Sequence, residues 1–493
     1  MMRRSTQPDQ QRAAAEVLRN SGHPQATSVP THDGDTRLRQ LGYTPRLKRG
    51  LTTLGSVILT LSDITPAGSL LIVGLAVVAV AGTGSVIAYL AGAALAVMVA
   101  LCMAELGSLY PIAGGIYSIV ARVLGTWAAF LTLLSYVVQA IFLPASIALG
   151  VGIYLNSLNS VFPVNLSAAV AMVIVTGLAM LKIHVNALMT ALFLALEMVV
   201  IVVIAVAGFS HPTQSIATFL NPAGVVDGRL ASFGTGAVIA AVAIALQSVN
   251  GYDAAISFSE ETKGSTRNVG KAVLLSCLVG VGLELAAFLG AAFGAPDLKA
   301  FLGSSTPLTY VVEQRWGHTA TTVLIVGAVI AFFNACLAIT LQFARVLWAS
   351  GRDGIWPGPV SRGLQKLLPS TDAPWVATLV VGTFATILCF ASNIVAVVTF
   401  VSVLTILIYV FVGVATIVSR QRDKTSERPF RLPLYPLPPI IAILGALLAL
   451  SQQAYKDLVI VVIIYAAGLA YYFFYLRSRR EAMTALRAPQ LVD

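Results

Sequence analysis

The clearest pattern along the chain is a series of apolar segments, each near the length of a membrane-spanning helix. A helix needs roughly 20 predominantly apolar residues to cross a bilayer. Twelve such segments are predicted, at residues 50–78, 84–108, 126–155, 165–182, 186–209, 235–259, 270–294, 319–346, 374–391, 394–419, 437–453 and 458–476. The pattern therefore predicts an all-α polytopic membrane protein with a twelve-helix domain at residues 46–476.

The first apolar segment is interrupted at its midpoint. The interruption runs from Thr60 to Leu70 and contains Asp63, Pro66 and Gly68. Proline removes a backbone donor and biases the preceding residue away from helix, and glycine allows close approach of another group. Broken backbone at membrane depth survives only where it is buried in protein or lines a wet cavity. The break indicates a transporter site whose half-helix ends bind a small zwitterion; a packed kink is the structural alternative.

The sixth segment is interrupted in the same way, at Gln247–Asp253. Broken helices at matching positions of two five-helix halves are typical of an inverted repeat, with the substrate at the repeat interface. We therefore expect discontinuous first and sixth helices, one repeat at about 46–210 and a second at about 230–420. Two additional helices follow at about 436–476. Opposite insertion of the two halves would make the breaks meet near the midplane.

Composition and charge agree with a membrane protein. Only 11% of the 493 residues are charged, against about 25% in soluble domains, and the mean hydropathy is +0.85. The net charge of +10 could suggest a nucleic-acid partner. However, 27 of the 31 Lys and Arg residues lie in the tails, in the even-numbered loops or at the span ends next to those loops, and only Arg229, Lys299, Arg315 and Lys456 lie in the odd-numbered loops. Cytoplasmic loops accumulate Lys and Arg, so we expect both termini in the cytoplasm, a cell-membrane location and no nucleic-acid partner.

The tails and connecting segments have distinct compositions. Residues 1–45 lack an apolar core and are predicted to be a disordered cytoplasmic tail, and residues 477–493 a cytoplasmic C-terminal tail. The segment after Gly114-Gly115 is predicted to form a re-entrant or interfacial helix. The loop 297–318 is predicted to contain an external lid helix. The segment Arg428–Pro433 is predicted to form a rigid hairpin rather than an SH3 ligand. The four cysteines lie in apolar runs without a CxxC pair and the histidines are scattered, so we expect no disulfide, metal or cofactor.

Several motifs resemble those of amino acid–polyamine–organocation (APC) permeases, in the order in which that family has them. They are Glu105 with Tyr110-Pro111 and Gly114–Tyr117, Gly251–Asp253 with Ser259–Thr262, Arg267–Val269 with Lys271, Arg345 with Ser350–Gly354 and Pro357, and Arg428–Arg431. The resemblance implies a LeuT-like fold of two inverted five-helix repeats plus two C-terminal helices.

The resemblance also implies roles for particular positions. In the family, backbone amides at the first break hold the substrate carboxylate, and carbonyl groups of both breaks hold its ammonium. The matching positions are Ser62, Asp63, Ile64, Thr65, Ala67, Gly68, Ser69, Gln247, Ser248, Asn250, Gly251 and Tyr252. This sequence departs from the family pattern in two ways. Asp63–Gly68 replaces the usual Gly-rich break, and Gln247 aligns with an aromatic gate, for which Tyr252 or Phe258 could substitute.

Four carboxylates within the spans are candidates for ion coupling: Asp63, Glu197, Asp253 and Glu284. A carboxylate near the midplane costs a few kcal/mol on insertion scales, so a function or a buried partner is expected. Burial favours the protonated form and a substrate ammonium favours the charged form, which is one basis for proton coupling. A protonated interhelical carboxyl is the alternative for Glu197 and Glu284, and bracing of the second break for Asp253. Some proton-coupled relatives carry a lysine on the fifth helix, which Asn186–Phe209 lacks.

Other polar residues lie within the apolar segments. Gln139 and most polar residues of the eighth span are explained as interhelical hydrogen bonds. We expect Asn334 to face the cavity, and Arg345 either to pair with a carboxylate or to extend toward the headgroups.

Together these features predict a secondary active transporter of amino acids or closely related amines, working by proton-coupled symport and alternating access. Its partners are then a small-molecule substrate, H+ and the lipid bilayer. The alternatives are a polyamine or amine carrier, favoured by Asp63 as a ligand for a second ammonium, and an ion-independent amino acid exchanger. A channel is disfavoured because no filter-like loop or charged ring occurs, and an enzyme because no catalytic cluster or Walker loop occurs. The sequence leaves open a monomer or a homodimer.

Overall fold

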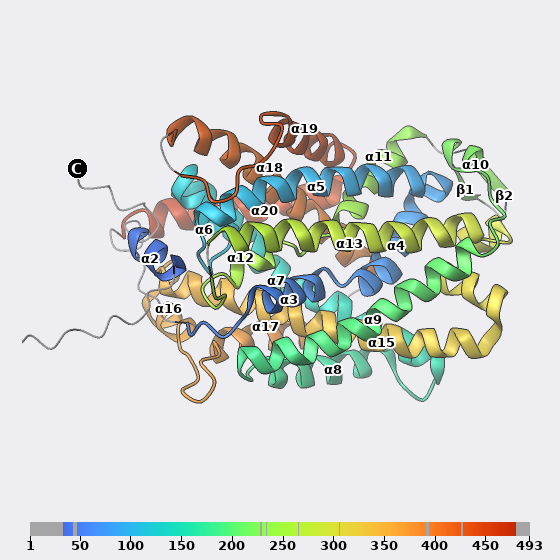
Figure 1. Ribbon diagram of the computed structural model, residues 1–493, viewed down its shortest axis with the longest axis horizontal. Coiled ribbons are helices and arrows are strands. Elements are labelled where there is room, and N and C mark those ends of the chain that lie inside the picture. The colour runs from blue at the N-terminus through green and yellow to red at the C-terminus, as the bar shows by residue number, and fades with distance from the viewer. Residues whose placement is uncertain are drawn as a thin grey trace, which may run out of the picture.

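The computed structural model describes residues 33–42, 47–226, 229–232, 234–264, 266–304, 306–390, 394–424 and 427–479. Long helices run side by side along the longest axis of the molecule (Figure 1). The helices are α2 (Asp33–Gln40), α3 (Thr53–Ile64), α4 (Pro66–Ala81), η1 (Gly82–Gly84), α5 (Ser85–Leu109), α6 (Ile116–Val123), α7 (Thr126–Leu158), α8 (Val164–Leu178), α9 (Ile183–Phe209), α10 (Ile216–Leu220), α11 (Thr235–Ser248), α12 (Ala254–Ser257), α13 (Thr266–Gly294), α14 (Leu298–Gly303), α15 (Pro307–Arg352), α16 (Gly358–Leu364), α17 (Trp375–Leu388), α18 (Ile394–Arg422), α19 (Leu437–Leu450), α20 (Tyr455–Tyr471) and η2 (Tyr472–Leu476). Strands β1 (Ala223–Val226) and β2 (Arg229–Ser232) form an antiparallel hairpin.

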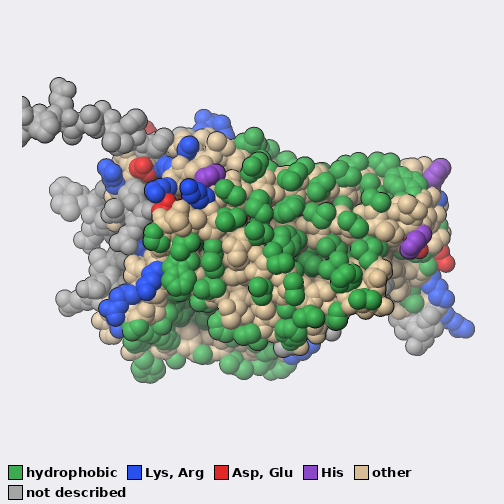
Figure 2. All heavy atoms as spheres, turned by 90° about the horizontal axis from the view of Figure 1, so that it is seen from below, with side chains coloured by type: hydrophobic (Ala, Val, Ile, Leu, Met, Phe, Trp, Pro, Cys, Tyr) green, Lys and Arg blue, Asp and Glu red, His purple; other side chains and the backbone are tan. Residues whose placement is uncertain are grey.

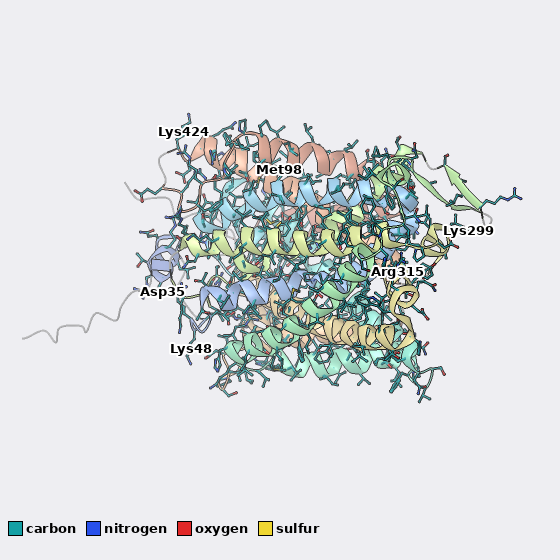
Figure 3. The ribbon with its side chains drawn as sticks, turned by 45° about the vertical axis from the view of Figure 1, so that its right-hand side comes forward. Asp35, Lys48, Met98, Lys299, Arg315 and Lys424 are labelled. Carbon is teal, nitrogen blue, oxygen red and sulfur yellow. The ribbon has the colours of Figure 1, made fainter. Side chains whose placement is uncertain are left out.

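The surface and the helix lengths are those of a multi-pass membrane protein. Seven helical stretches of the described residues are long and apolar enough to cross a membrane, and four shorter apolar helices accompany them. Hydrophobic side chains cover the middle of the face seen in Figure 2, and Lys and Arg gather at its two ends. Figure 3 places Asp35, Lys48 and Lys424 at one end and Lys299 and Arg315 toward the other. We call the first of these the α2 end. It carries Asp35 and Lys48 from the chain before α3 and Lys424 from the chain between α18 and α19.

The predicted apolar segments correspond to observed helices within a few residues, with one notable extension. Helix α15 begins at Pro307, before the predicted eighth span, and Gly317 interrupts it with a φ of 77°. The part before Gly317, together with α14, occupies the loop where a lid helix was predicted. The helix predicted after Gly115 is α6.

The described part of the predicted N-terminal tail contains a helix that the sequence did not predict. This helix is α2, and its Leu38 is only 1% exposed. Leu38 and Leu41 pack with Ile112 near the end of α5. Arg49 holds the helix from the side, because its Nε donates to Asp35 Oδ1 at 2.7 Å. A short polar helix can order in this way when neighbouring elements supply the apolar contact. Residues 1–32, 43–46 and 480–493 lie outside the described residues.

The predicted hairpin before α19 is held by a buried carboxylate. Glu105, near the end of α5, is fully buried and accepts hydrogen bonds from Arg420 Nε at 2.8 Å, Arg428 Nη1 at 3.0 Å and the Leu432 amide at 2.8 Å. A buried carboxylate is stable when paired and hydrogen-bonded in this way. Two motifs noted in the sequence, Glu105 and Arg428–Arg431, therefore form a single structural contact.

Candidate substrate site

The first break lies between α3 and α4. Thr65 adopts a left-handed conformation with φ 45°, and Pro66 occupies the first position of α4. Proline is tolerated there because its missing N–H would have no intrahelical acceptor. The Ser69 amide makes the first intrahelical bond of α4, to Thr65 O at 2.8 Å. The N-terminus of α4 therefore presents two amides that lack an intrahelical acceptor, those of Ala67 and Gly68.

A carboxylate from α9 occupies this helix N-terminus. Glu197 Oε1 accepts hydrogen bonds from the Ala67 amide at 2.8 Å and from Thr65 Oγ1 at 3.0 Å, and the Gly68 amide interacts with the same carboxylate. Asn334 Nδ2 on α15 lies 3.5 Å from Glu197 Oε2. Glu197 is fully buried. A negative charge is favourable at this position because the amides and the helix dipole point toward it.

The second break brings the chain directly against the first. Helix α11 ends at Ser248, the chain passes through Gly251 with a φ of 116°, and α12 begins at Ala254. A Cβ atom on Gly251 would lie 2.8 Å from Asp63 Oδ2 and 2.9 Å from Asp63 O. Only glycine permits this approach, because it has no Cβ and adopts positive φ without strain. The two breaks lie against each other, as predicted from the sequence.

A small cavity lies beside this contact. Its volume is about 30 Å³, room for about two water molecules. Seven residues of the two breaks line it, namely Asp63, Thr65, Ser69, Gln247, Asn250, Gly251 and Asp253. Its apolar wall includes Val73, Leu143, Ile147 and Ile339. The described lining includes no Lys, Arg or His. Two carboxyl groups therefore face a cavity that contains no basic side chain.

The two carboxyl groups differ in their hydrogen bonds. Asp253 Oδ2 accepts from Tyr136 Oη at 2.5 Å and from Gln342 Nε2 at 3.2 Å. Asp63 is 4% exposed, and its Oδ1 atom has no hydrogen-bond partner among the described residues. A buried carboxylate oxygen without a partner is costly, so a proton or a cation from outside the chain is the expected partner of Asp63.

Two other polar side chains of the second break, those of Gln247 and Asn250, bond to α18. Thr405 Oγ1 donates to Gln247 Oε1 at 2.5 Å, and Tyr409 Oη donates to Asn250 Oδ1 at 2.5 Å. Tyr252 is buried outside the cavity lining and stacks on Tyr409, with ring centroids 6.2 Å apart. These contacts join the second break to α18.

Several residues predicted for the site lie outside the cavity. Ser62 donates to the Thr190 carbonyl on α9 at 3.4 Å, and Ile64 is buried in the apolar core. Ala67 and Gly68 face Glu197 as described above. Phe258, considered as an aromatic gate, lies beneath the Arg345 guanidinium, 5.2 Å from the ring centroid. The predicted positions thus divide between the cavity wall and the packing behind it.

Glu284 forms a separate network behind the second break. Ser248 Oγ donates to Glu284 Oε2 at 2.6 Å, and Tyr89 Oη lies 2.7 Å from the same Ser248 oxygen. Glu284 is fully buried on α13, and the ring of Tyr89 stacks on Phe288. Each break is therefore bonded to a buried glutamate of a neighbouring helix: Glu197 at the first and Glu284 at the second.

Ion pairs lie at the α2 end of the site. Arg345 donates to both carboxylate oxygens of Glu261, in one case at 3.0 Å. Arg352 pairs with Glu260 at 2.8 Å and with Asp353 at 3.2 Å. The pairing of Arg345 with a carboxylate, one of the two roles predicted for it, is confirmed.

A backbone bridge strengthens the same end. The Leu51 amide donates to Glu261 O at 2.9 Å, the Lys263 amide donates to Leu51 O at 2.8 Å, and Arg49 donates to the Thr262 carbonyl. The chain before α3 and the chain after α12 are therefore tied together.

The cavity also contains residues that sequence reasoning did not assign to the site. They are Tyr136 on α7, Gln342 and Phe343 on α15, and Thr405 and Tyr409 on α18. Gln342 was explained as an interhelical hydrogen bond, and the others were not considered. A tyrosine or threonine in an apolar helix carries no sequence signal that tells a cavity wall from helix packing.

These elements define a multi-pass helical membrane protein with a polar site between two broken helices. The sequence pattern of the family described as amino acid permease matches residues 51–475. The chain therefore belongs to the amino acid permease family, a family of membrane transporters and not of enzymes, and the expected resemblance to APC permeases is confirmed.

Individual relatives match along nearly their whole length. The chain is 26% identical to the branched-chain amino acid permease BcaP of Bacillus subtilis, over 88% of this chain and 94% of that protein. It is 23% identical to the methylthioribose transporter of the same organism, with the same coverage. It is 25% identical to the serine/threonine exchanger SteT of B. subtilis, over 87% of this chain and 97% of that protein.

Proposed function

We propose that the protein is a secondary active transporter that binds the ammonium group of an amino acid or a related amine between its two helix breaks. The observation that carries this proposal is the unpartnered, buried Oδ1 atom of Asp63 in a cavity formed where the breaks meet. An ammonium group would satisfy that oxygen and gain a charge-assisted hydrogen bond. The solutes named for the two relatives, branched-chain amino acids for BcaP and serine and threonine for SteT, belong to this class.

The proposed architecture is a twelve-span LeuT-like fold with two inverted repeats and two C-terminal helices. The stretch Thr53–Leu109 has 57 residues, about twice the length that a single crossing requires, so it contributes two spans. With the other long stretches and the four shorter helices, this gives twelve. The two breaks are five spans apart, which supports the inverted repeat.

The proposed mechanism is alternating access with the α2 end closed in the present conformation. A cavity of about 30 Å³ does not hold an amino acid, so its walls must separate to admit one. The ion pairs and the backbone bridge at the α2 end support closure on that side. We place this end and both termini on the cytoplasmic side of the cell membrane, because the tails and the even-numbered loops carry most of the Lys and Arg.

Proton coupling is assigned to Glu197. Its carboxylate accepts a hydrogen bond from the Ala67 amide and lies beside the Gly68 amide, so protonation weakens the contact between α9 and the N-terminus of α4. Because α4 also carries residues that line the cavity, protonation of Glu197 is linked to the position of the cavity wall. Glu284 is the second candidate, through Ser248.

The test uses purified protein in liposomes, with an inward proton gradient and no sodium. A labelled panel of neutral, acidic, basic and aromatic amino acids, together with putrescine, identifies the solute. Concentrative uptake that a protonophore abolishes supports proton symport. Glu197→Gln should then retain counterflow but lose accumulation, whereas the exposed Glu313→Gln serves as a control. Uptake only into preloaded vesicles would indicate an exchanger, and no uptake of any solute would contradict transport.

A further inference from the structure

We propose that the preferred substrate is an aliphatic diamine without a carboxylate group. This inference rests on the proposed function and narrows it to a substrate class. Two independent observations carry it: the chain itself occupies the place where a substrate carboxylate would bind, and the cavity presents two carboxyl groups.

The first observation concerns the amides of the first break. A broken helix in a transporter binds a substrate carboxylate through the free amides at a half-helix N-terminus. Here Pro66 has no amide hydrogen, the Ser69 amide bonds to Thr65 O, and Glu197 accepts from Ala67 and interacts with Gly68. The Ala67 and Ser69 amides are therefore already bonded within the chain, and the Gly68 amide lies beside the same Glu197 carboxylate.

A substrate carboxylate would have to compete with Glu197 for these donors. It would also approach a buried negative charge without a neighbouring cation, which is unfavourable at low dielectric. Glu197 acts as a built-in carboxylate at the α4 N-terminus. The remaining recognition chemistry of the site suits a positively charged group.

The second observation concerns the cavity. Asp63 and Asp253 both line it, and the described lining contains no Lys, Arg or His. The unpartnered Oδ1 atom of Asp63 points to a ligand that is absent from the chain. Two ammonium groups would match the two carboxyl groups, with one at Asp63 and the other at Asp253.

The apolar part of the cavity suits the middle of such a molecule. Val73, Ile147 and Ile339 line the cavity together with the two aspartates. Methylene groups would pack against these side chains with favourable burial of apolar surface. A short aliphatic diamine thus matches the cavity in charge and in polarity.

The matched probes are cadaverine and lysine, which differ only by the α-carboxylate of lysine. Uptake and binding are measured on the full-length protein in liposomes and in detergent. We expect cadaverine to bind at least about tenfold more tightly than lysine. Equal or tighter binding of lysine would overturn the inference.

Substitution of Glu197 tests the reason for the selectivity. Glu197→Ala frees the α4 amides, so the affinity for lysine should approach that for cadaverine. Glu197→Gln keeps an amide acceptor in place and should retain much of the discrimination. An unchanged cadaverine-to-lysine ratio in Glu197→Ala would overturn the role given to Glu197. If that variant does not fold, the ratio of the cadaverine and lysine affinities of the wild-type protein still tests the preference for a diamine.

Substitution of Asp63 tests the second ammonium. The probes are cadaverine and pentylamine, which has the same chain and a single amino group. Asp63→Asn should reduce the preference for cadaverine over pentylamine at least tenfold, and Glu313→Gln should not change it. The same preference in Asp63→Asn would contradict the two-site binding. Transport of leucine but not of cadaverine would overturn only the diamine inference, whereas a failure to transport any solute of the panel would overturn the proposed function itself.

Discussion

The phenol of Tyr136 donates a 2.5 Å hydrogen bond to Asp253 Oδ2, which ties α7 to the second helix break. Asp253 receives one further hydrogen bond at this oxygen, from Gln342 at 3.2 Å. The orientation of the Asp253 carboxyl group in the cavity therefore depends on side chains from two helices outside the break.

We predict that Tyr136→Phe raises the KM for transport about tenfold or more. A hydrogen bond to a charged group contributes about 1.5–3 kcal/mol, and its loss leaves Asp253 less well oriented. The measurement is initial uptake into liposomes as a function of substrate concentration. Tyr465→Phe is the matched control. It removes a phenolic hydroxyl that hydrogen-bonds to Ser135, which lies on α7 next to Tyr136 but outside the cavity lining. An unchanged KM in Tyr136→Phe would show that Asp253 does not depend on the phenol.

The close approach of Gly251 to Asp63 gives a second prediction. Gly251→Ala should reduce transport by more than tenfold, because the new Cβ would lie 2.8 Å from Asp63 Oδ2 and the residue has a φ of 116°. The control is Gly282→Ala on α13, where a Cβ would meet nothing within 4 Å. Transport is compared at equal amounts of monodisperse protein. Wild-type rates for Gly251→Ala would mean that the two breaks separate more easily than this contact allows.

The sequence predicted the breaks well because their causes are local. Pro66 and Gly251 carry backbone restrictions that are visible in any single sequence. The pairing of Arg345 was also predictable, since a buried guanidinium requires a partner. By contrast, the order in α2 depends on contact between Leu38 and Ile112, and a charged eight-residue stretch carries no sign of such a contact.

The partners of the buried carboxyl groups could not be predicted in the same way. Asp63, Glu197, Asp253 and Glu284 all stood out as carboxylates in apolar segments. Hydrophobic spacing does not say which helix lies beside which, so the contact of Glu197 with Ala67 became visible only in three dimensions. For the same reason the contact of Tyr136 with Asp253 could not be predicted, since the two residues are 117 positions apart in the sequence.

The buried ion pair between Arg345 and Glu261 gives a third prediction. Arg345→Met should lower the free energy of unfolding by about 3–5 kcal/mol, because it leaves a buried, unpaired carboxylate. The double variant Arg345→Met/Glu261→Met should recover much of this loss, since it removes both charges. Reversible unfolding in detergent micelles measures the difference.

The control for that pair is Lys48→Met. Lys48 pairs with Asp372 at 2.8 Å, but its side chain is 81% exposed, so the loss should be at most about 1 kcal/mol. If the double variant were as unstable as Arg345→Met, the destabilisation would come from lost packing rather than from the unpaired charge.

The docking of α2 gives the last prediction. Leu38→Ala should release α2 from the rest of the protein, because it removes a side chain that is 1% exposed and packs on Ile112. Truncation of a buried leucine costs about 2–5 kcal/mol, more than a short polar helix can recover by itself. Hydrogen exchange should then accelerate at residues 33–42, with the middle of α5 unchanged. Arg39→Ala is the control, since Arg39 is exposed on the same helix. Equal exchange in the two variants would mean that the polar contacts, such as that of Arg49 with Asp35, hold α2 without the apolar contact.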